Sequence, residues 1–326
     1  MTWMITGGAG YIGAHVTRTL AEAGESVVVL DDLSSGVPGR LGPQVRQVEG
    51  STLDRALLER TLAEHRVDGV VHLAAKKQVG ESVAQPLRYY RENVHGLTVL
   101  LEAVAAAGVR RFVFSSSAAV YGMPDVDLVT EETPCVPMNP YGETKLAGEW
   151  LVRAAGRAHG IRTACLRYFN VAGAARPELA DTGVFNIVPM YFDALTHGRA
   201  PLIFGDDYPT PDGTCIRDYI HVQDLAEAHL AAARHLSKDG TEGDLTVNVG
   251  TGEGVSVREM ADLVADVTGR TEPAAQVAPR RAGDPARVVA SAERIGRELG
   301  WAPRHKVRDM VESAWQGWRR LYPQAR

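Results

Sequence analysis

Short apolar runs alternate with helical patterns along the first half of this 326-residue chain, and this alternation restricts the fold more than any other feature of the sequence. It is typical of βαβ units, which build a parallel sheet covered by helices on both faces. A helix is expected to open at Tyr11, and a long one is expected at Pro86–Ala107. The expected strands are Trp3–Thr6, Ser26–Leu30, Val45–Val48, Gly69–Leu73, Arg111–Ser115 and Thr163–Arg167. The sequence therefore predicts an α/β fold with a doubly wound parallel sheet, the Rossmann arrangement.

The alternation of apolar runs and helical patterns ends after Asn170, where loops rich in Gly, Pro and Asp begin, notably at 204–218. We expect residues 1–170 to form the sheet domain and residues 171–326 to form a smaller C-terminal α/β lobe. The run Thr246–Val249 lies between turn residues and is expected to return to the first sheet as a strand. Helices of the second lobe are expected at Asp224–His235, Val257–Thr268 and Val307–Tyr322.

A glycine-rich segment, Gly7–Gly13, lies between the first expected strand and the first expected helix. Glycines at this place permit a tight turn and let backbone N–H groups approach a pyrophosphate at the helix N-terminus. Asp31 and Asp32 follow the second strand, where an acid hydrogen-bonds ribose hydroxyls and repels a 2′-phosphate. The pattern predicts a dinucleotide site that prefers NAD to NADP, although a simple βα turn without a ligand has the same glycines. The candidate contacts are Gly7, Gly10, Tyr11, Ile12, Gly13, Asp31 and Asp32.

Tyr141 and Lys145 are four residues apart in a segment with a helical pattern, so they share one helix face. Ser117 follows an apolar strand, where its hydroxyl would face a ligand at the carboxyl edge of the sheet. An ammonium about 5 Å from a phenol favours the phenolate by about 3 kcal/mol at an effective dielectric constant of ~20, which suits a tyrosine to act as a general base. We predict that Ser117, Tyr141 and Lys145 are catalytic; the alternative is a surface pair on an amphipathic helix.

Together these motifs resemble those of the extended short-chain dehydrogenase/reductases, and within that family those of the UDP-glucose (UDP-galactose) 4-epimerases. The resemblance covers nearly the whole chain. The motifs shared by the whole family are the glycine-rich segment, Ser117 with Tyr141 and Lys145, and Leu166–Asn170. The motifs that resemble the epimerase branch in particular are Phe204–Val222 and Ala278–Asp284.

The resemblance implies a reversible epimerisation at C4 of a UDP-hexose, with NAD as a transient hydride acceptor. Tyr141 would take the proton of the sugar 4-hydroxyl while the hydride leaves C4, and Ser117 would hydrogen-bond the same oxygen. The 4-keto sugar would then turn over and receive the hydride on its other face. This scheme needs no metal.

The resemblance also assigns further residues, with NAD bound by residues 1–170 and the nucleotide sugar by residues 171–326. From the residues alone, Arg217 and Arg281 could pair with a diphosphate in bidentate fashion or could be solvated surface charges. Likewise Phe204 could contact the uracil or lie in the core. The residues implied near NAD are Asp31, Lys77, Asn93, Tyr141, Lys145 and Tyr168, and those implied near the nucleotide sugar are Lys77, Ser117, Asn170, Asn186, Phe204, Arg217, Arg281 and Asp284.

One departure from the family pattern concerns the adenine end of the cofactor site. The family usually has Gly-Asp after the third strand, with the acid contacting adenine, whereas this chain reads Glu49-Gly50-Ser51-Thr52. Ser51 therefore stands where the acid is expected. We expect Ser51 and Thr52 to lie at the cofactor, with tight retention of NAD left open.

A second departure concerns substrate range. Val288 matches a pocket position that is often tyrosine in relatives restricted to plain hexoses and small in relatives that accept 2-acetamido sugars. Valine would leave room for an N-acetyl group at C2, so UDP-N-acetylglucosamine is expected as a secondary substrate. A register shift of one residue would instead put the long Arg287 side chain in the pocket.

Two rival functions share the expected fold. Sugar-nucleotide 4,6-dehydratases carry an acid pair directly after the catalytic hydroxyl, but Ala118 and Ala119 follow Ser117 here. A non-catalytic NAD-sensing regulator usually loses the Tyr and Lys pair, which this chain keeps. Another NAD-dependent sugar-nucleotide epimerase remains the alternative within the enzyme class.

Composition limits the partners and the compartment. A net charge of −5 gives no field that would attract nucleic acid, and no apolar run approaches the ~18 residues of a membrane span. The cysteines Cys135, Cys165 and Cys215 lack metal-type spacing and suggest free thiols in a reducing compartment. With no room for a signal peptide before the first strand, a cytoplasmic location is expected. The resemblance implies a homodimer that pairs through the helices at Pro86–Ala107 and Tyr141–Ala155.

Overall fold

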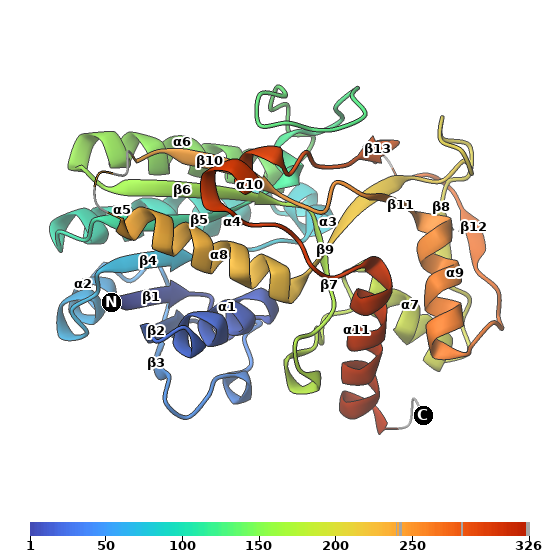
Figure 1. Ribbon diagram of the computed structural model, residues 1–326, viewed down its shortest axis with the longest axis horizontal. Helices are drawn as coiled ribbons and strands as arrows, with labels where there is room; N and C mark the ends of the chain where they lie inside the picture. Colours follow the sequence, from blue (N-terminus) through green and yellow to red (C-terminus); the bar gives the residue numbers. More distant parts are fainter. Residues whose placement is uncertain (239, 241–242, 282, 324–326) are drawn as a thin grey trace.

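The computed structural model describes residues 1–238, 240, 243–281 and 283–323, and it is built around a seven-stranded sheet (Figure 1). The strand order is β3-β2-β1-β4-β5-β6-β10, and every neighbouring pair is parallel. The chain winds outward from β1 in both directions, which confirms the doubly wound α/β fold. The strands are β1 (Thr2–Thr6), β2 (Ser26–Asp31), β3 (Arg46–Glu49), β4 (Gly69–His72), β5 (Arg111–Ser117), β6 (Arg162–Tyr168) and β10 (Leu245–Val249).

Helices cover both faces of this sheet, and the central strands are largely apolar on both sides for that reason, whereas the edge strand β3 is mostly exposed. Side chains alternate between the two faces of a strand, so on β1 Trp3 and Ile5 join one core and Met4 joins the other. The helices on the first face are α1 (Tyr11–Glu22), α8 (Val222–Ser237) and α10 (Glu293–Leu299), and those on the second are α2 (Arg55–Glu64), α5 (Gly96–Ala106) and α6 (Pro140–His159).

Most of the elements after β6 form a smaller α/β lobe beside the carboxyl ends of the sheet strands (Figure 1). The helix expected there at Asp224–His235 is part of α8, which packs on the large sheet instead. The core of the smaller lobe gathers around Phe192, Trp315 and Trp318. Its helices are α7 (Ile187–Thr196), α9 (Val257–Thr268) and α11 (Val307–Leu321). Its strands are β7 (Asn170–Ala172), β9 (Ile216–His221), β11 (Gly254–Ser256) and β13 (Arg287–Val288) in one sheet, and β8 (Leu202–Phe204) with β12 (Gln276–Ala278) in another.

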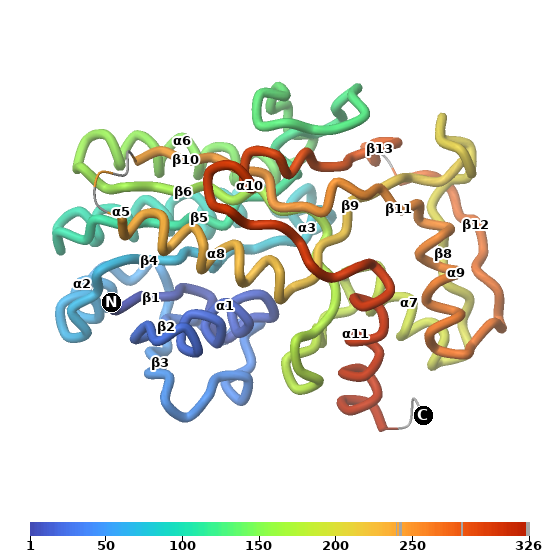
Figure 2. The backbone as a smooth tube through the Cα atoms, viewed as in Figure 1, coloured from blue at the N-terminus to red at the C-terminus, as the bar shows by residue number. Residues whose placement is uncertain are grey.

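The two halves are interleaved along the chain. β10 pairs with β6 at the edge of the large sheet, as the run Thr246–Val249 predicts. The tube in Figure 2 then shows α10 lying against the sheet domain before the chain reaches α11 in the second lobe. Segments beyond residue 171 therefore contribute to both halves. No helix of the described ranges is long and apolar enough to cross a membrane.

The structure differs from the sequence prediction in two segments. The predicted loop 204–218 contains the start of β9, because Ile216 pairs with β11 and β13 although polar residues follow it. The predicted helix Pro86–Ala107 consists of α4 (Pro86–Tyr89), a π-helical stretch at Tyr90–His95 and α5. α3 (Val79–Ala84), α2, α7 and α10 were not predicted, because their apolar periods are short.

Candidate active site

A cavity of about 1060 Å³ lies where the parallel strands end, between the sheet and the second lobe. In doubly wound sheets this edge is where ligands bind. Of the residues predicted for the site, Asn93 and Phe204 lie outside the lining and the others form part of it. The predicted residues in the lining are Gly7, Gly10, Tyr11, Ile12, Gly13, Asp31, Asp32, Ser51, Thr52, Lys77, Ser117, Tyr141, Lys145, Tyr168, Asn170, Asn186, Arg217, Arg281, Asp284 and Val288.

The glycine-rich segment forms a turn into which no larger residue fits. Gly7 has a φ of +74°, and a Cβ there would lie 2.7 Å from the backbone nitrogen of Ala74. A Cβ on Gly13 would lie 2.0 Å from the carbonyl oxygen of Gly7. The turn leads directly into α1, so its backbone N–H groups are available to an anion at the helix N-terminus.

Two acids follow this turn at the end of β2. Asp31 is buried and accepts hydrogen bonds from the backbone nitrogens of Ala9 and Leu33, both at 2.9 Å. Burial opposes ionisation of Asp32, but two hydrogen bonds from Ser34 and the nearby Lys76 ammonium lower its pKa. Both carboxylates are therefore fixed beside the cavity, at the place expected for a ribose.

Ser51 lies in the lining near these acids, at the turn before α2. Its hydroxyl oxygen accepts a hydrogen bond from the backbone nitrogen of Leu53 at 3.1 Å. Ser51 thus brings a hydroxyl, and no negative charge, to the position where the family carries an acid.

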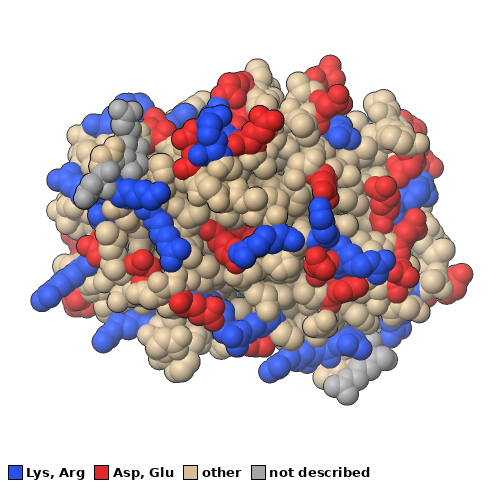
Figure 3. Space-filling model, viewed as in Figure 1, with Lys and Arg blue, Asp and Glu red and all other residues tan. Residues whose placement is uncertain are grey.

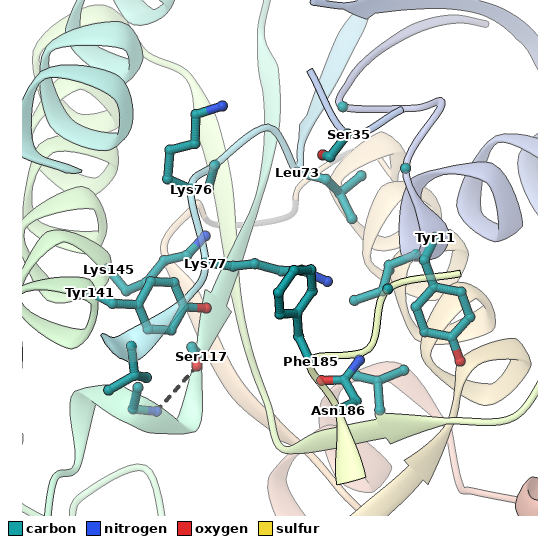
Figure 4. A pocket seen from close by; sticks show the side chains of 18 of the residues that line it. Tyr11, Ser35, Leu73, Lys76, Lys77, Ser117, Tyr141, Lys145, Phe185 and Asn186 are labelled. Atoms are coloured by element: carbon teal, nitrogen blue, oxygen red, sulfur yellow. Dashed lines mark hydrogen bonds between the residues drawn. The ribbon is translucent and has the colours of Figure 1, made fainter. Parts of the chain in front are cut away.

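α6 carries Tyr141 and Lys145 into the cavity from its first two turns. Asn139 caps the helix, because its side-chain oxygen accepts a hydrogen bond from the backbone nitrogen of Gly142 at 2.9 Å. Lys145 is buried, its Nζ lies 6.0 Å from the centre of the Tyr141 ring, and it donates to the carbonyl oxygen of Ser115 at 2.8 Å. The shared helix face therefore brings the two side chains together as predicted (Figure 4).

The protonation states of this pair differ from the sequence expectation. Burial lowers the pKa of Lys145 to about 8, and the Glu149 carboxylate one turn further along α6 opposes that shift. Burial raises the pKa of Tyr141, and the Ser117 hydroxyl opposes it. The pKa of the phenol is therefore raised, not lowered as the sequence analysis expects, because burial is the largest cause acting on it.

Ser117 is the last residue of β5, and its hydroxyl points into the cavity beside Tyr141 (Figure 4). Its Oγ accepts a hydrogen bond from the backbone nitrogen of Ala119 at 3.2 Å, which begins a short 3-10 helix, Ala118–Val120. The serine and the tyrosine thus present two hydroxyls to one region of the cavity.

Two arginines from the second lobe, Arg217 and Arg281, also line the cavity. Arg217, in β9, lies with Nη2 3.5 Å from a carboxylate oxygen of Asp284 and donates to the carbonyl oxygen of Ile216 at 2.9 Å. The Arg281 guanidinium lies 3.7 Å from the centre of the Phe204 ring. Two cations that converge on one cavity are suited to hold a diphosphate.

Val288 lines the cavity and is 7% exposed, whereas Arg287 is absent from the described lining. The Arg287 side chain turns outward, where its Nε donates to the carbonyl oxygen of Asp127 at 3.0 Å. β13 pairs with β9 here and alternates its two residues between opposite sides. The short side chain, and not the long one, therefore forms part of the cavity wall, where it also packs against a buried apolar cluster that includes Tyr121 and Phe169.

Asn93 and Phe204 lie behind the lining. The Asn93 side chain accepts from the backbone nitrogen of Lys76 at 2.8 Å and donates to its carbonyl oxygen at 2.9 Å, so it holds the loop that presents Lys77. Phe204 is the last residue of β8, and the Arg281 guanidinium packs on its ring.

Several lining residues were not predicted. Lys76 reaches across the cavity mouth, where its Nζ donates to the Ser34 hydroxyl at 3.0 Å. Phe185 projects into the cavity toward Lys77 and is 59% exposed (Figure 4). In the sequence, Lys76 is simply a second lysine beside Lys77, and Phe185 is an aromatic residue beside Asn186. Neither pattern predicts a site residue, so only the tertiary structure identifies these two residues. Further lining residues that were not predicted include Arg40, Asp181, Thr182 and Gly183.

The chemistry available in the cavity is proton transfer and anion binding. Tyr141, Ser117 and Lys145 supply hydroxyls and an ammonium at one place, and the arginines supply positive charge at another. Within the described residues, no three His, Cys, Asp or Glu side chains gather to hold a metal ion.

Comparisons with known proteins agree with this geometry. Residues 3–250 match the model of the NAD dependent epimerase/dehydratase family. The UDP-glucose 4-epimerase of Azospirillum brasilense is 47% identical to the chain over 326 residues, which cover 99% of the chain and 93% of that protein.

Solved structures show the same likeness. A crystal structure of a UDP-glucose 4-epimerase superposes with a TM-score of 0.94 at 43% identity, covering 99% of this chain and 98% of that one. The UDP-glucose 4-epimerase from Bifidobacterium longum, solved in complex with NAD+ and UDP, superposes with a TM-score of 0.91 at 37% identity, covering 100% of both chains. The likeness therefore extends over both lobes and the cavity between them.

Proposed function

Because the chain belongs to the NAD dependent epimerase/dehydratase family, we propose that it catalyses the reversible C4 epimerisation of UDP-glucose and UDP-galactose. The protein is an NAD-dependent epimerase, an isomerase. We assign NAD binding to residues 1–170 together with β10, and nucleotide-sugar binding to the remainder of residues 171–326. The observation that carries the proposal is a single cavity that is lined both by Tyr141, Ser117 and Lys145 and by the second-lobe arginines Arg217 and Arg281.

The residues present fit NAD. A Cβ would fill the cradle formed by Gly7 and Gly13, so the backbone there is bare for a pyrophosphate. Asp31 ends β2 beside that cradle and favours a free 2′-hydroxyl over a 2′-phosphate. We propose that Gly10, Tyr11, Ile12, Asp32, Ser51, Thr52, Lys77 and Tyr168 complete the cofactor site, with Asn93 acting through the loop of Lys77.

NAD, when bound, supplies the hydride acceptor and donor for the sugar C4. The phenolic oxygen of Tyr141 takes the proton of the 4-hydroxyl and later returns it, which makes the residue base and acid in turn. Ser117 hydrogen-bonds the same sugar oxygen and steadies it as a 4-keto group forms. The Lys145 ammonium would favour the phenolate electrostatically, whereas burial of Tyr141 opposes it. The sugar is oxidised and then reduced at C4, so the reaction has no net redox change.

The nucleotide must stay held while the keto sugar turns over. We propose that Arg217 and Arg281 hold the diphosphate, and that Asp284 positions Arg217 through the contact at 3.5 Å. We further propose that Lys77, Asn170 and Asn186 contact the nucleotide sugar. Phe204, which was expected at the uracil, lies outside the cavity lining, so we propose that it acts through Arg281, whose guanidinium packs on its ring. Firm binding at the diphosphate leaves the sugar itself free to present either face.

The test is an assay of purified protein with UDP-galactose, coupled to detection of UDP-glucose, with no NAD added and then with NAD in excess. Conversion without net consumption of NAD supports an epimerase. Release of water and a stable 4-keto-6-deoxy product would indicate a dehydratase instead. That outcome is not expected, because Ala118 and Ala119 occupy the cavity wall where an acid would be needed. Binding of NAD without turnover of any UDP-sugar would indicate a regulator.

We also propose UDP-N-acetylglucosamine as a secondary substrate. Support comes from Val288, whose short side chain lines the cavity while Arg287 points away. An added contact in an apolar pocket is worth about 1–3 kcal/mol, so a preference between substrates is expected in place of strict selection.

We propose that the enzyme is a homodimer. α4 and α6 carry large apolar side chains that are unusually exposed: Leu87 is 84% exposed and Trp150 59%. Contacts between α4 and α6 join these two helices. Contiguous apolar surface of this kind marks an interface in soluble proteins.

We propose a cytoplasmic location, since all three cysteines are free thiols. Nucleic acid is not a proposed partner. Basic and acidic side chains are interspersed over the face shown in Figure 3, and the formal charge of the chain is −5. Such a surface has no field of one sign to attract a polyanion.

A further inference from the structure

Arg40 is a buried charged residue to which the proposed reaction gives no role. It ends the 3-10 helix η1 (Pro38–Arg40) between β2 and β3, and it is 9% exposed. Its Nη2 donates to the carbonyl oxygen of Ala180 at 2.7 Å and to the hydroxyl of Thr182 at 3.2 Å. Burying an arginine is costly unless such partners meet its donors. Arg40 thus fastens the cofactor half of the molecule to a segment of the second lobe.

That segment, residues 180–186, forms one wall of the cavity. The Asp181 carboxylate accepts from the backbone nitrogen of Gly183 at 3.0 Å and from Nδ2 of Asn186 at 2.6 Å. Arg40 also attracts this carboxylate electrostatically. The wall is therefore held by Arg40 of the cofactor half and by hydrogen bonds to Asp181 within the segment, and Asp181 sets the direction of the Asn186 side chain.

Tyr11 makes a parallel connection. Its hydroxyl donates to the carbonyl oxygen of Gly173 at 2.5 Å, in the strand-to-loop connection that leads to the 180–186 segment. Tyr11 begins α1 at the end of the glycine-rich turn, so both connections start from the cofactor half. In Figure 4, Tyr11, Phe185 and Asn186 lie across the cavity from Ser117 and Tyr141.

We propose that Arg40 is a positioning residue for nucleotide-sugar binding, which holds the 180–186 segment so that Phe185 and Asn186 face the substrate. The inference rests on the proposed function, because it takes the ligand on this side of the cavity to be a UDP-sugar. Releasing the segment moves residues that face the nucleotide sugar and leaves the proton-transfer residues in place. Loss of Arg40 should therefore weaken substrate binding much more than it slows the chemical step.

The test compares Arg40→Met with Arg40→Lys. Methionine keeps an apolar stem but removes the charge and both hydrogen bonds, and we expect KM for UDP-galactose to rise roughly 10- to 100-fold with kcat within about threefold of the parent. Lysine restores the charge without the planar fork of donors, so an intermediate KM is expected. Arg46→Met, at an exposed arginine that begins β3, is the matched control and should keep the parent KM.

Hydrogen exchange gives a second readout. Backbone amides of residues 180–186 should exchange faster in Arg40→Met, while those of β1 and β5 keep the parent rates. If Arg40→Met does not fold, Thr182→Val removes one of the two acceptors and should give a smaller rise in KM with the same local increase in exchange.

Three results would overturn the proposal: an unchanged KM in folded Arg40→Met, a fall in kcat at constant KM, or a KM defect that disappears when NAD is added in excess. The last would mean that Arg40 serves the cofactor. A parent protein that does not convert UDP-galactose would count against the proposed function alone. In that case the dissociation constant of UDP, measured by calorimetry in the parent and in Arg40→Met, decides the role of Arg40.

Discussion

At the scale of single residues, burial shifts the pKa values of the two ionisable catalytic residues, Tyr141 and Lys145, away from the ionised forms. Tyr141 lies where burial raises the pKa of its phenol, and Lys145 lies where burial lowers the pKa of its ammonium to about 8. Both shifts oppose the phenolate and ammonium pair that base catalysis needs. The Ser117 hydroxyl and the Glu149 carboxylate oppose these shifts, and the cofactor adds its own charge when bound. The ionised pair of Tyr141 and Lys145 therefore depends on the groups around it as well as on the two side chains themselves.

Tyr141→Phe should lower kcat by about 10²- to 10⁴-fold, because it removes the only atom that exchanges the proton in the proposed mechanism. UDP should still bind with near-parent affinity, since the ring and the arginines remain. Steady-state turnover of UDP-galactose and a UDP titration provide the measurement. Tyr90→Phe is the matched control, because that hydroxyl bonds Glu143 on the outer surface at 2.9 Å. Near-normal turnover in Tyr141→Phe would contradict the assignment.

Val288→Tyr should reduce kcat/KM for UDP-N-acetylglucosamine by roughly 10-fold or more while UDP-galactose turnover changes little, because a tyrosine ring fills space beside the sugar. The measurement compares kcat/KM for both substrates in the parent and the variant. Arg287→Ala serves as control, since that side chain points to Asp127 outside the cavity. Absence of acetamido-sugar turnover in the parent, or equal loss of both activities in Val288→Tyr, would rule out this role.

At the scale of elements, the sequence predicts what local pattern determines. β1, β2 and β4 are buried for most of their length and are nearly continuous apolar runs, so the sequence identifies them readily. β3, at the edge of the sheet, is mostly exposed and has only Val48 as an apolar residue. The proximity of Ser117, Tyr141 and Lys145 is also predictable, because Tyr141 and Lys145 are one helix turn apart and Ser117 ends a strand. β9 is not, since its pairing with β7, β11 and β13 brings together segments distant in sequence. The bonds of Arg40 to the 180–186 segment span 140 residues and leave no local signal.

α6 is also fixed to the sheet by a buried ion pair. Glu149 accepts two bonds from Arg167 on β6, at 2.6 and 2.8 Å, and one from the Ser116 hydroxyl on β5 at 2.6 Å. Glu149 lies on the same helix face as Tyr141 and Lys145. The pair therefore connects the helix that carries the catalytic residues to the two strands beneath it.

Glu149→Ala should lower the free energy of unfolding by about 3–5 kcal/mol, because it leaves the Arg167 guanidinium buried without its partner. Urea unfolding of the parent and the variant measures this. Combining Glu149→Leu with Arg167→Met removes both charges and should recover much of the loss. A single variant as stable as the parent would show that the guanidinium finds another partner.

At the scale of the whole molecule, the exposed apolar side chains on α4 and α6 have a direct consequence for assembly. Leu87→Glu should shift the molecular mass in solution from dimer toward monomer, because it puts a charge into the proposed interface. Light scattering after gel filtration measures the mass. Val277→Glu, at an exposed apolar residue on β12 in the other lobe, should leave the mass unchanged. A parent protein that is monomeric at micromolar concentration would disprove the dimer.

Buried histidines make the whole fold sensitive to acid. Burial lowers the pKa of His15, His221 and His229 to about 4 and that of His72 to about 3. The hydrogen bonds agree with neutral rings: Nδ1 of His15 donates to the carbonyl oxygen of Tyr11 at 2.8 Å, which leaves Nε2 to accept from the backbone nitrogen of Ala175 at 3.2 Å. The unfolded chain takes up protons below about pH 6.5, whereas the folded chain does not until much lower pH.

Stability should therefore be complete above about pH 6.5 and fall as the pH decreases toward 4, by roughly 1.4 kcal/mol per pH unit for each such histidine. Urea unfolding at pH 7, 6 and 5, with NAD in fixed excess, measures this slope. His72→Asn keeps an acceptor for the Thr6 hydroxyl, which lies 2.7 Å from Nδ1 of His72, and should reduce the slope by one histidine's share. His159→Gln, at an exposed histidine of α6, should leave the slope as it is. Equal slopes in the parent and His72→Asn would mean that another group, and not the buried imidazole, takes up the proton on unfolding.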